Sequence, residues 1–239
     1  MKRLTLVCLL YLGFPNSIFS QFSPQKVISE QSAFYARHIA PADIDQDGDM
    51  DVFAFNDGEP DFLSWHENDG EGNFINRTII GDGLDNTYRI KVLDINDDAA
   101  PDLITIRTTE DFSIEEIRLF QNDGNGNFTD QVIFSGRVLI MSVDFVDLNN
   151  DRILDLLMVQ DFDRYELAYY PNDQNYPLEQ SVQLKELTND DDLRFTLADF
   201  DMDGRMDVME INHKKSLIQS TLVGGPTWGL RGWASHNLC

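Results

Sequence analysis

The sequence predicts an all-β fold, and three observations support this prediction. A nine-residue acidic loop occurs four times at a nearly constant spacing, beginning at Asp43, Asp94, Asp147 and Asp199. Each loop leads directly into a short apolar run of strand length, and a turn motif built on Asn-Asp follows in three of the four units. Four strands in about 50 residues, repeated along the chain, are typical of a β-propeller, so we expect four-stranded blades in about four repeats.

The first repeat shows how each element is assigned. We expect an inner strand over Ile39 to Ala42, and the acidic loop separates it from a second strand over Val52 to Phe55. A third strand is expected over Phe62 to Glu67, and the hairpin "NDGEGN" connects it to an outer strand over Phe74 to Ile80. Asn-Asp-Gly between apolar runs favours a tight hairpin, because asparagine and glycine accept the positive φ that such turns require.

The first loop, "DIDQDGDMD", places a carboxylate at every odd position and glycine at the sixth. Carboxylates this close repel one another unless a cation lies between them. In a tight metal loop, the side chains at positions one, three and five converge, position seven offers its carbonyl, and a later carboxylate closes the shell. All-oxygen ligands suit calcium, and the lack of Cys or His in the loop disfavours zinc or copper. The candidate ligands are therefore Asp43, Asp45, Asp47, Asp49 and Asp51.

The other three loops repeat this pattern with substitutions. Position six is glycine in the first and fourth loops but Ala99 and Arg152 in the second and third, where asparagine also replaces aspartate at position three. A non-glycine residue at positive φ costs about 1–2 kcal/mol, so we expect these two loops to bind calcium more weakly or to fold differently. The corresponding ligands are Asp94, Asn96, Asp98, Ala100 and Asp102 in the second loop; Asp147, Asn149, Asp151, Ile153 and Asp155 in the third; and Asp199, Asp201, Asp203, Arg205 and Asp207 in the fourth.

An EF-hand is the alternative interpretation of these loops. The fourth loop places Glu210 at position twelve, as an EF-hand requires, but the first three loops have Ala54, Thr105 and Met158 there. The approach to the fourth loop, "LRFTLAD", alternates apolar and polar residues and lacks the 3.6-residue period of an entering helix. The pattern therefore favours loops between strands.

The paired motifs D-x-[DN]-x-D-G-x-x-D and N-D-G-x-G-N-F resemble the VCBS and FG-GAP repeats. The second motif occurs in "WHENDGEGNF" from Trp65 and "LFQNDGNGNF" from Leu119, and "YYPNDQNYPL" from Tyr169 is a degenerate copy. The resemblance extends over roughly Val27 to Ile211. It implies a calcium-binding β-propeller similar to the integrin α-chain head, and says little about the ligand. We expect this propeller to act as a binding or adhesion module for carbohydrate or protein ligands.

Matching aromatic residues precede each hairpin motif, and they have two possible roles. Stacking on sugar rings is one role, but a position that recurs in every repeat is more often part of the core. We therefore expect core packing for Trp65, Phe120, Tyr169 and Tyr170.

The chain divides into three segments. Residues 1–20 begin with two basic residues and continue through "LTLVCLLYLGF", which predicts a signal peptide cleaved near Ser20 and a secreted or cell-surface protein. Residues 21–211 hold the repeats, and residues 212–239 are expected to form a degenerate last blade or a tail outside the repeat. No later apolar run approaches the roughly 18 residues of a membrane span, so we expect no membrane insertion.

The number of blades leaves two arrangements open, a complete four-bladed ring or a fragment of a larger propeller. The residues "KVIS" from Lys26 match the outer-strand residues Thr78 to Gly81. One hypothesis is that they supply the outer strand of the last blade and thereby close the ring.

The formal net charge of −24 argues against nucleic acid and anionic membranes as partners, because both require basic patches. The connections opposite the acidic loops are also acidic, which suits neutral sugars or cationic proteins. No nucleophile elbow, H-E-x-x-H or P-loop motif occurs, so no catalytic residue is assigned. Two alternatives to a binding module stay open: a calcium-dependent polysaccharide lyase or hydrolase, and a structural repeat of a larger surface assembly.

Overall fold

The computed structural model describes residues 27–28, 36–56, 61–149, 151–161, 165–186, 193–199, 202, 206–212, 217–222 and 231–237. Sixteen strands in these residues form four antiparallel sheets of four strands each. The described part of the chain contains no helix. The predicted all-β fold of four-stranded units is therefore confirmed.

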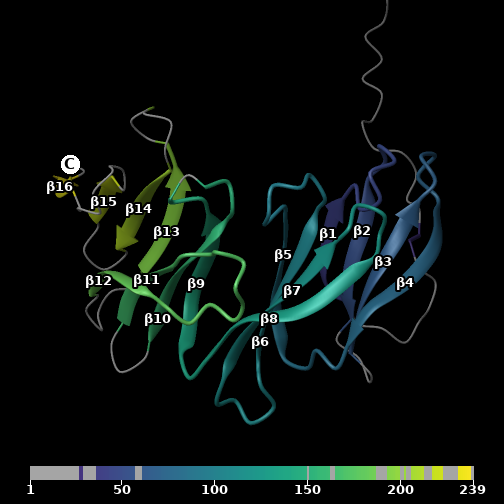
Figure 1. Cartoon of the computed structure of the whole chain (residues 1–239), viewed down its shortest axis with the longest axis horizontal. Helices are drawn as coiled ribbons and strands as arrows, with labels where there is room; N and C mark the ends of the chain where they lie inside the picture. The colour runs from purple at the N-terminus through teal and green to yellow at the C-terminus, as the bar shows by residue number, and fades with distance from the viewer. Residues whose placement is uncertain are drawn as a thin grey trace, which may run out of the picture.

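Each sheet is a meander in which strands consecutive in sequence are also neighbours in space (Figure 1). The first sheet consists of β1 (Ala36–Ala42), β2 (Asp51–Asn56), β3 (Phe62–Asn68) and β4 (Phe74–Asp82). The second consists of β5 (Thr87–Leu93), β6 (Asp102–Thr108), β7 (Glu115–Asn122) and β8 (Phe128–Gly136). The third consists of β9 (Leu139–Val146), β10 (Asp155–Asp161), β11 (Tyr165–Tyr170) and β12 (Val182–Glu186), and the fourth of β13 (Leu193–Ala198), β14 (Asp207–Asn212), β15 (Leu217–Leu222) and β16 (Arg231–Asn237).

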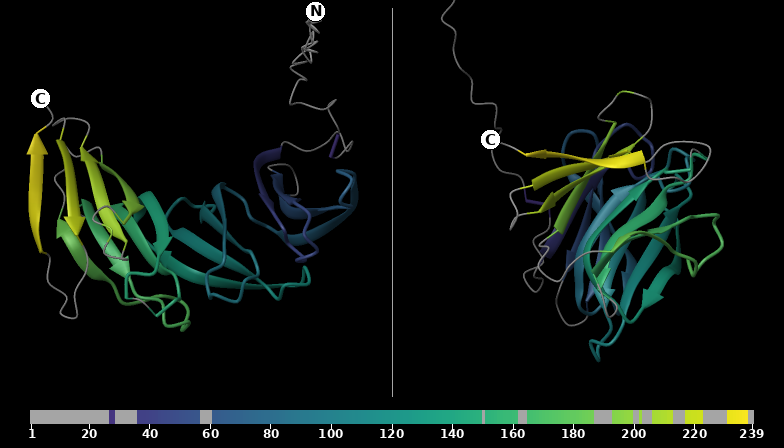
Figure 2. Two further views of the ribbon diagram at one scale, coloured as in Figure 1. Left: turned by 90° about the horizontal axis from the view of Figure 1, so that it is seen from above. Right: turned by 90° about the vertical axis from the view of Figure 1, so that its left-hand side faces the viewer.

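The sheets follow one another in an open arc, with the first and fourth sheets at its two ends (Figures 1 and 2). The inner strands β1 and β5 contact each other, as neighbouring blades of a propeller do. The described strands form no closed ring. In the fourth sheet the outer position is taken by β16, which pairs with β15, so the hypothesis that "KVIS" supplies this strand is wrong.

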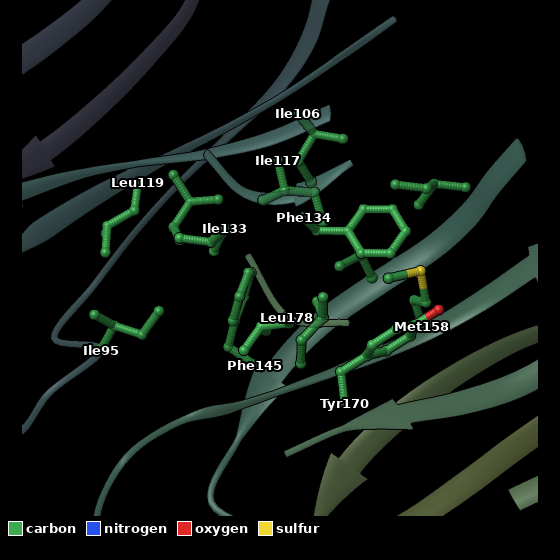
Figure 3. Close-up of a cluster of buried hydrophobic side chains, with 14 of the residues drawn as sticks. Ile95, Ile106, Ile117, Leu119, Ile133, Phe134, Phe145, Met158, Tyr170 and Leu178 are labelled. Carbon is green, nitrogen blue, oxygen red and sulfur yellow. The ribbon is translucent and has the colours of Figure 1, made fainter. Parts of the chain in front are cut away.

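Apolar clusters lie between successive sheets and hold the arc together. Phe53 and Trp65 of the first sheet pack with Leu103 and Phe120 of the second. A larger cluster between the second and third sheets includes Ile106, Ile117, Ile133, Phe145, Met158 and Tyr170 (Figure 3). The third and fourth sheets share a further cluster, to which Tyr169 and Val208 belong. The aromatic residues before the hairpins are thus buried, as predicted.

Strand β10 shows why the runs after the acidic loops are continuously apolar. Successive side chains of a strand point to opposite faces. Met158 accordingly packs against the second sheet, whereas Leu157 and Val159 pack toward the fourth. Because both faces of this strand are buried, every position of "LLMV" is apolar.

The connection between β11 and β12 is the degenerate copy of the hairpin motif, and it extends to the neighbouring sheet. The N–H of Leu178 donates to the carbonyl of Ile133 in β8 at 2.7 Å. The side chain of Leu178 is buried in the cluster between the second and third sheets, near Phe145 (Figure 3). The hairpin that departs from the motif is therefore also the one whose Leu178 links the third sheet to the second.

Candidate metal centre

The acidic loops connect the first strand of each sheet to the second. Position six has positive φ in each of the first three loops: 98° at Gly48, 68° at Ala99 and 73° at Arg152. The second and third loops thus keep the backbone conformation that glycine favours in the first. Of the two outcomes expected for these loops, a different fold is excluded, and weaker calcium binding stays a prediction.

Position four also has positive φ in the first, second and fourth loops, which the sequence did not reveal. The φ angles are 61° at Gln46, 61° at Asp97 and 60° at Met202. No glycine marks this position, and its residue types share no chemical property. The loop therefore turns twice through the left-handed region, and only one of the two turns has a sequence signal.

The last carboxylate of each of the first three loops is buried and joins the loop to the hairpin of the same sheet. Asp51 accepts the N–H of Ile44 at 3.2 Å and the N–H of Asn68 at 2.7 Å. Asp102 and Asp155 make the same pair of contacts in the second and third loops. Each of these carboxylates thus holds the start of its loop and the end of the third strand together.

The first asparagine of each hairpin motif returns a hydrogen bond to the acidic loop. The side-chain amide of Asn68 donates to the carbonyl of Met50 at 3.1 Å. Asn122 and Asn172 make the same contact with the position-eight carbonyls of their loops, at 3.3 and 2.9 Å. These bonds explain why the two motifs occur together in the sequence.

Burial raises the pKa of the closing carboxylates. The pKa of Asp102 rises to about 6 because the group is desolvated, although the N–H groups of Asn122 and Ile95 favour its charged form. Burial likewise raises the pKa of Asp51 and of Asp155. A cation close to these groups would favour their ionised form.

The first loop brings three of its predicted ligands together. Ligand oxygens of Asp43, Asp45 and Asp47 lie within 4.8 Å of one another. One oxygen of Asp43 accepts the N–H of Gly48, and one oxygen of Asp47 accepts the N–H of Asp49. Oδ1 of Asp43 and Oδ1 of Asp45 are buried and accept no hydrogen bond from any described residue. Buried charged oxygens without partners are unfavourable, so this donor set fits a hard cation such as calcium.

The electrostatics of the first loop support this fit. Burial raises the pKa of Asp45, and the negative charges of Asp47 and Asp51 raise it further. A divalent cation would reverse this effect by favouring the ionised carboxylates.

In the second and third loops, position three carries the side-chain amide of an asparagine where the first loop has the carboxylate of Asp45. The side-chain N–H of Asn96 donates to Asp98 at 2.8 Å, and that of Asn149 donates to Asp151 at 2.9 Å. Both oxygens of each position-one aspartate accept backbone N–H groups. These aspartates are Asp94 and Asp147.

Position seven was predicted to offer its carbonyl to the cation. In the three loops, the N–H groups of Asp49, Ala100 and Ile153 donate to the position-five carboxylates at 2.8 to 2.9 Å. These bonds fix the backbone at position seven, while the ligand role of its carbonyl stays a prediction. In the fourth loop, Asp199 and Asp207 are described, whereas Asp201, Asp203 and Arg205 lie outside the described residues.

The acidic loops of successive sheets also contact one another. Gln46 of the first loop donates to the carbonyl of Ala99 in the second at 2.8 Å. The N–H of Leu154 in the third loop donates to the carbonyl of Ile95 in the second at 3.0 Å. Asn122 of the second hairpin donates to Ile44 in the first loop at 2.7 Å. The acidic loops and hairpins thus share one end of the sheets, as the strand order predicts.

At the opposite end, the connection between β6 and β7 presents an exposed aromatic residue. Phe112 is 73% exposed and has a φ of 56°. Asp111 accepts hydrogen bonds from Thr109 and Ser113 on either side and so orders this turn. Other connections at this end, 57–60, 162–164 and 187–192, lie outside the described residues.

Comparison with known proteins agrees with the repeat pattern. A family model described as FG-GAP-like repeat matches residues 43–105 and 108–158. None of the curated proteins compared with the chain matches it. Among the described residues, no helix has the length and apolar character needed to cross a membrane. The predicted resemblance is confirmed for residues 43–105 and 108–158, which match the FG-GAP-like repeat model.

Proposed function

We propose that the chain is a secreted, calcium-binding β-propeller module that binds a carbohydrate or protein ligand. One observation carries the calcium part of this proposal: the cluster of Asp43, Asp45 and Asp47, in which two buried oxygens accept no hydrogen bond from the described residues. FG-GAP-like repeats commonly bind calcium and occur in extracellular or surface proteins, which supports both the metal and the location. The signal peptide itself lies outside the described residues.

Calcium in the first loop would act on more than one sheet. The side chains of Asp43, Asp45 and Asp47 would hold the ion, together with the carbonyl of Asp49 and the carboxylate of Asp51 as the sequence predicts. The same loop contacts the second sheet through Gln46, and Asn122 contacts the loop in return. A bound ion would therefore stiffen the boundary between the first two sheets.

The charge of the chain makes this stabilisation important. A net charge of −24 destabilises a compact state through self-repulsion, and bound calcium offsets part of it. An ion that binds only the folded chain adds about 2.7 kcal/mol at a hundredfold excess over its Kd. The free energy of unfolding of a typical domain is about 5–15 kcal/mol, so one calcium site changes stability substantially.

Calorimetric titration with calcium tests the metal site. We expect Asp45→Ala to lose one equivalent of bound calcium relative to the unmodified chain. Asp85→Ala is the matched control, because Asp85 is exposed in the connection between β4 and β5, away from the acidic loops, and its replacement changes the charge equally. Retention of every equivalent by Asp45→Ala would contradict the assignment of the first loop.

A glycan array tests the binding part of the proposal. The array is probed with the chain in calcium and again in excess EGTA, with circular dichroism to confirm that the chain stays folded in both. Calcium-dependent binding by folded protein supports a calcium-stabilised carbohydrate-binding module. A chain that binds no glycan in either condition directs the search to protein ligands, and equal binding in both conditions contradicts the role of calcium.

A further inference from the structure

We infer that Asn125 is a site of spontaneous covalent modification, at which the folded chain converts asparagine to aspartate and isoaspartate. Asn125 lies in the hairpin between β7 and β8, which is the second copy of the Asn-Asp-Gly motif. The reaction uses only water and groups of the chain itself. It is therefore independent of bound calcium and goes beyond the proposed function.

The reaction joins the side chain of Asn125 to the backbone of Gly126. The backbone N–H of Gly126 loses its proton to base, and its nitrogen attacks Cγ of Asn125. The new C–N bond closes a five-membered succinimide ring, while the bond from Cγ to Nδ2 breaks and Nδ2 leaves as ammonia with a proton from water. Water then opens the ring at either carbonyl and gives aspartate or isoaspartate. One water is consumed and one ammonia released, with no oxidation or reduction.

The sequence restricts this chemistry to one hairpin. Glycine after asparagine favours ring closure, because it has no Cβ to hinder the approach. Asn125-Gly126 is the only Asn-Gly pair in the chain. The matching residue of the first hairpin is Glu71, whose longer side chain would have to close a larger ring. In the third hairpin, Asn175 is followed by the bulky Tyr176.

The structure leaves both reacting groups accessible. Asn125 is exposed, and its side-chain amide donates to the carbonyl of Asp123 at 3.2 Å, which is a bond between neutral groups. The N–H of Gly126 donates to no acceptor among the described residues. Ring closure at Asn125 therefore costs the hairpin one weak hydrogen bond.

The neighbouring side chains of the same hairpin are held more firmly. The amide of Asn127 donates to the carboxylate of Asp123 at 2.9 Å, and hydrogen bonds to charged groups are the stronger ones. Asn127 is also followed by Phe128 and not by glycine. Asp123 precedes Gly124, but the side-chain amide of Asn127 and the N–H of Asn125 lower its pKa. Its ionised carboxylate resists attack by a nucleophile.

Modification of Asn125 would act on the boundary between the first two sheets. A Cβ placed on Gly126 would overlap ring carbons Cζ3 and Cη2 of Trp65, so the hairpin backbone lies directly against this ring. Trp65 is buried and packs with Leu103 and Phe120. Isoaspartate carries the backbone through its side chain and lengthens it by one carbon–carbon bond, about 1.5 Å. Isoaspartate should therefore loosen the contact between the hairpin and Trp65.

Incubation of the folded chain at pH 6 and at pH 9 tests the modification. Peptide mapping by mass spectrometry, with fragmentation that distinguishes isoaspartate from aspartate, follows each asparagine over time, and circular dichroism confirms that the chain stays folded. We expect Asn125 to convert about tenfold faster than Asn127 or more, and faster at pH 9, because deprotonation precedes the attack. Equal rates at the two asparagines, or conversion only in a chain unfolded by urea, would overturn the assignment.

Two variants test the effect on Trp65. Asn125→Gln keeps the amide but closes the ring slowly, so its melting temperature and tryptophan emission should stay constant during incubation. In the unmodified chain, the melting temperature should fall and the emission should shift to the red in step with the isoaspartate fraction. Freshly prepared Asn125→Asp has the new charge without the longer backbone, and it should match the fresh unmodified chain. If this variant differs as much as the incubated chain, or if the isoaspartate form melts like the fresh chain, the proposed effect on Trp65 is wrong.

Discussion

The first and second acidic loops have the same backbone path but differ in how they satisfy their carboxylates. In the second loop, Asn96 and backbone N–H groups supply a donor to every carboxylate oxygen of positions one and five. In the first loop, Asp43 and Asp45 each keep a buried oxygen that accepts no hydrogen bond from the described residues. The comparison teaches that the backbone path of an acidic loop and the hydrogen bonding of its carboxylates are set by different positions.

The largest expected effect concerns the feature that the two loops share. Asp102→Ala should lower the free energy of unfolding by about 2–6 kcal/mol, because it leaves two buried N–H groups without an acceptor at about 1–3 kcal/mol each. Asp51→Ala should have a similar effect in EGTA. Urea denaturation measures both values.

Asp97→Asn is the control for Asp102→Ala. Asp97 lies at position four, exposed and in the left-handed region, where asparagine is well tolerated. Its replacement removes the same charge and should change stability by no more than about 0.5 kcal/mol. A large loss in this control would show that charge, and not the two hydrogen bonds, explains the effect at Asp102.

Removal of calcium should have the next largest effect, and it separates the loops. One site at a hundredfold excess over Kd contributes about 2.7 kcal/mol, which corresponds to a melting shift of about 5–10 °C for a chain of this size. The shift caused by EGTA should be smaller by that amount in Asp45→Ala than in the unmodified chain. Thermal melts followed by circular dichroism measure the difference, and an equal shift in both proteins would contradict the comparison.

Position six offers a sharper test of the backbone. Gly48→Ala should destabilise the chain by about 1–2 kcal/mol, because alanine is strained at a φ of 98°, while nothing lies within 4 Å of the added Cβ. Ala99→Gly should stabilise it by about 0.5–1 kcal/mol, since the relief of strain exceeds the extra entropy of glycine in the unfolded chain. Chemical denaturation in EGTA measures both, and stabilisation by Gly48→Ala would show that the two loops do not share this constraint.

The smallest expected effect is on the pH dependence of stability, and it involves Glu115, a buried carboxylate outside the acidic loops. Glu115, at the other end of the second sheet, accepts the hydroxyl hydrogens of Tyr88 and Thr108, while burial raises its pKa. A raised pKa means that the folded chain holds this proton more tightly than the unfolded chain. Its contribution to stability is therefore present below the ordinary glutamate pKa and lost as pH rises through the raised value.

Glu115→Gln keeps the shape of this side chain and removes its titration. Relative to the unmodified chain, the variant should gain stability as pH rises above the ordinary glutamate range. Unfolding free energies measured from pH 4 to pH 8 in EGTA check this expectation. A difference that shrinks with rising pH would mean that the two hydroxyls stabilise the charge more than burial opposes it.

The strand positions could be predicted from the sequence because the acidic loop and the hairpin motif recur together in the repeats. The expected strands of the first repeat lie within β1, β2, β3 and β4, since the constant loop spacing located each inner turn and the Asn-Asp-Gly motif located each hairpin. Alternation could not be used in β6 and β10, whose apolar runs are buried on both faces. There the acidic loop before the strand supplied the boundary.

The interior of the loops was less predictable, because residue type alone does not reveal hydrogen bonding. Asn96 and Asp45 both count as oxygen ligands in a spacing argument, yet one donates to its neighbour and the other cannot. Gln46 contacts Ala99 across more than fifty residues, which no local pattern indicates. The burial of Leu178 against the second sheet could not be predicted either, because its hairpin departs from the repeat motif and no sequence pattern links it to that sheet.

The links between successive loops have a consequence for recognition. Neighbouring sheets are joined at one end by the contacts of Gln46 with Ala99 and of Leu154 with Ile95. At the other end, the short connections 83–86 and 137–138 join them covalently. Sheets held at both ends have little freedom to splay or twist against each other. A ligand that spans two blades would therefore meet a surface already in its binding shape, and association would lose less conformational entropy.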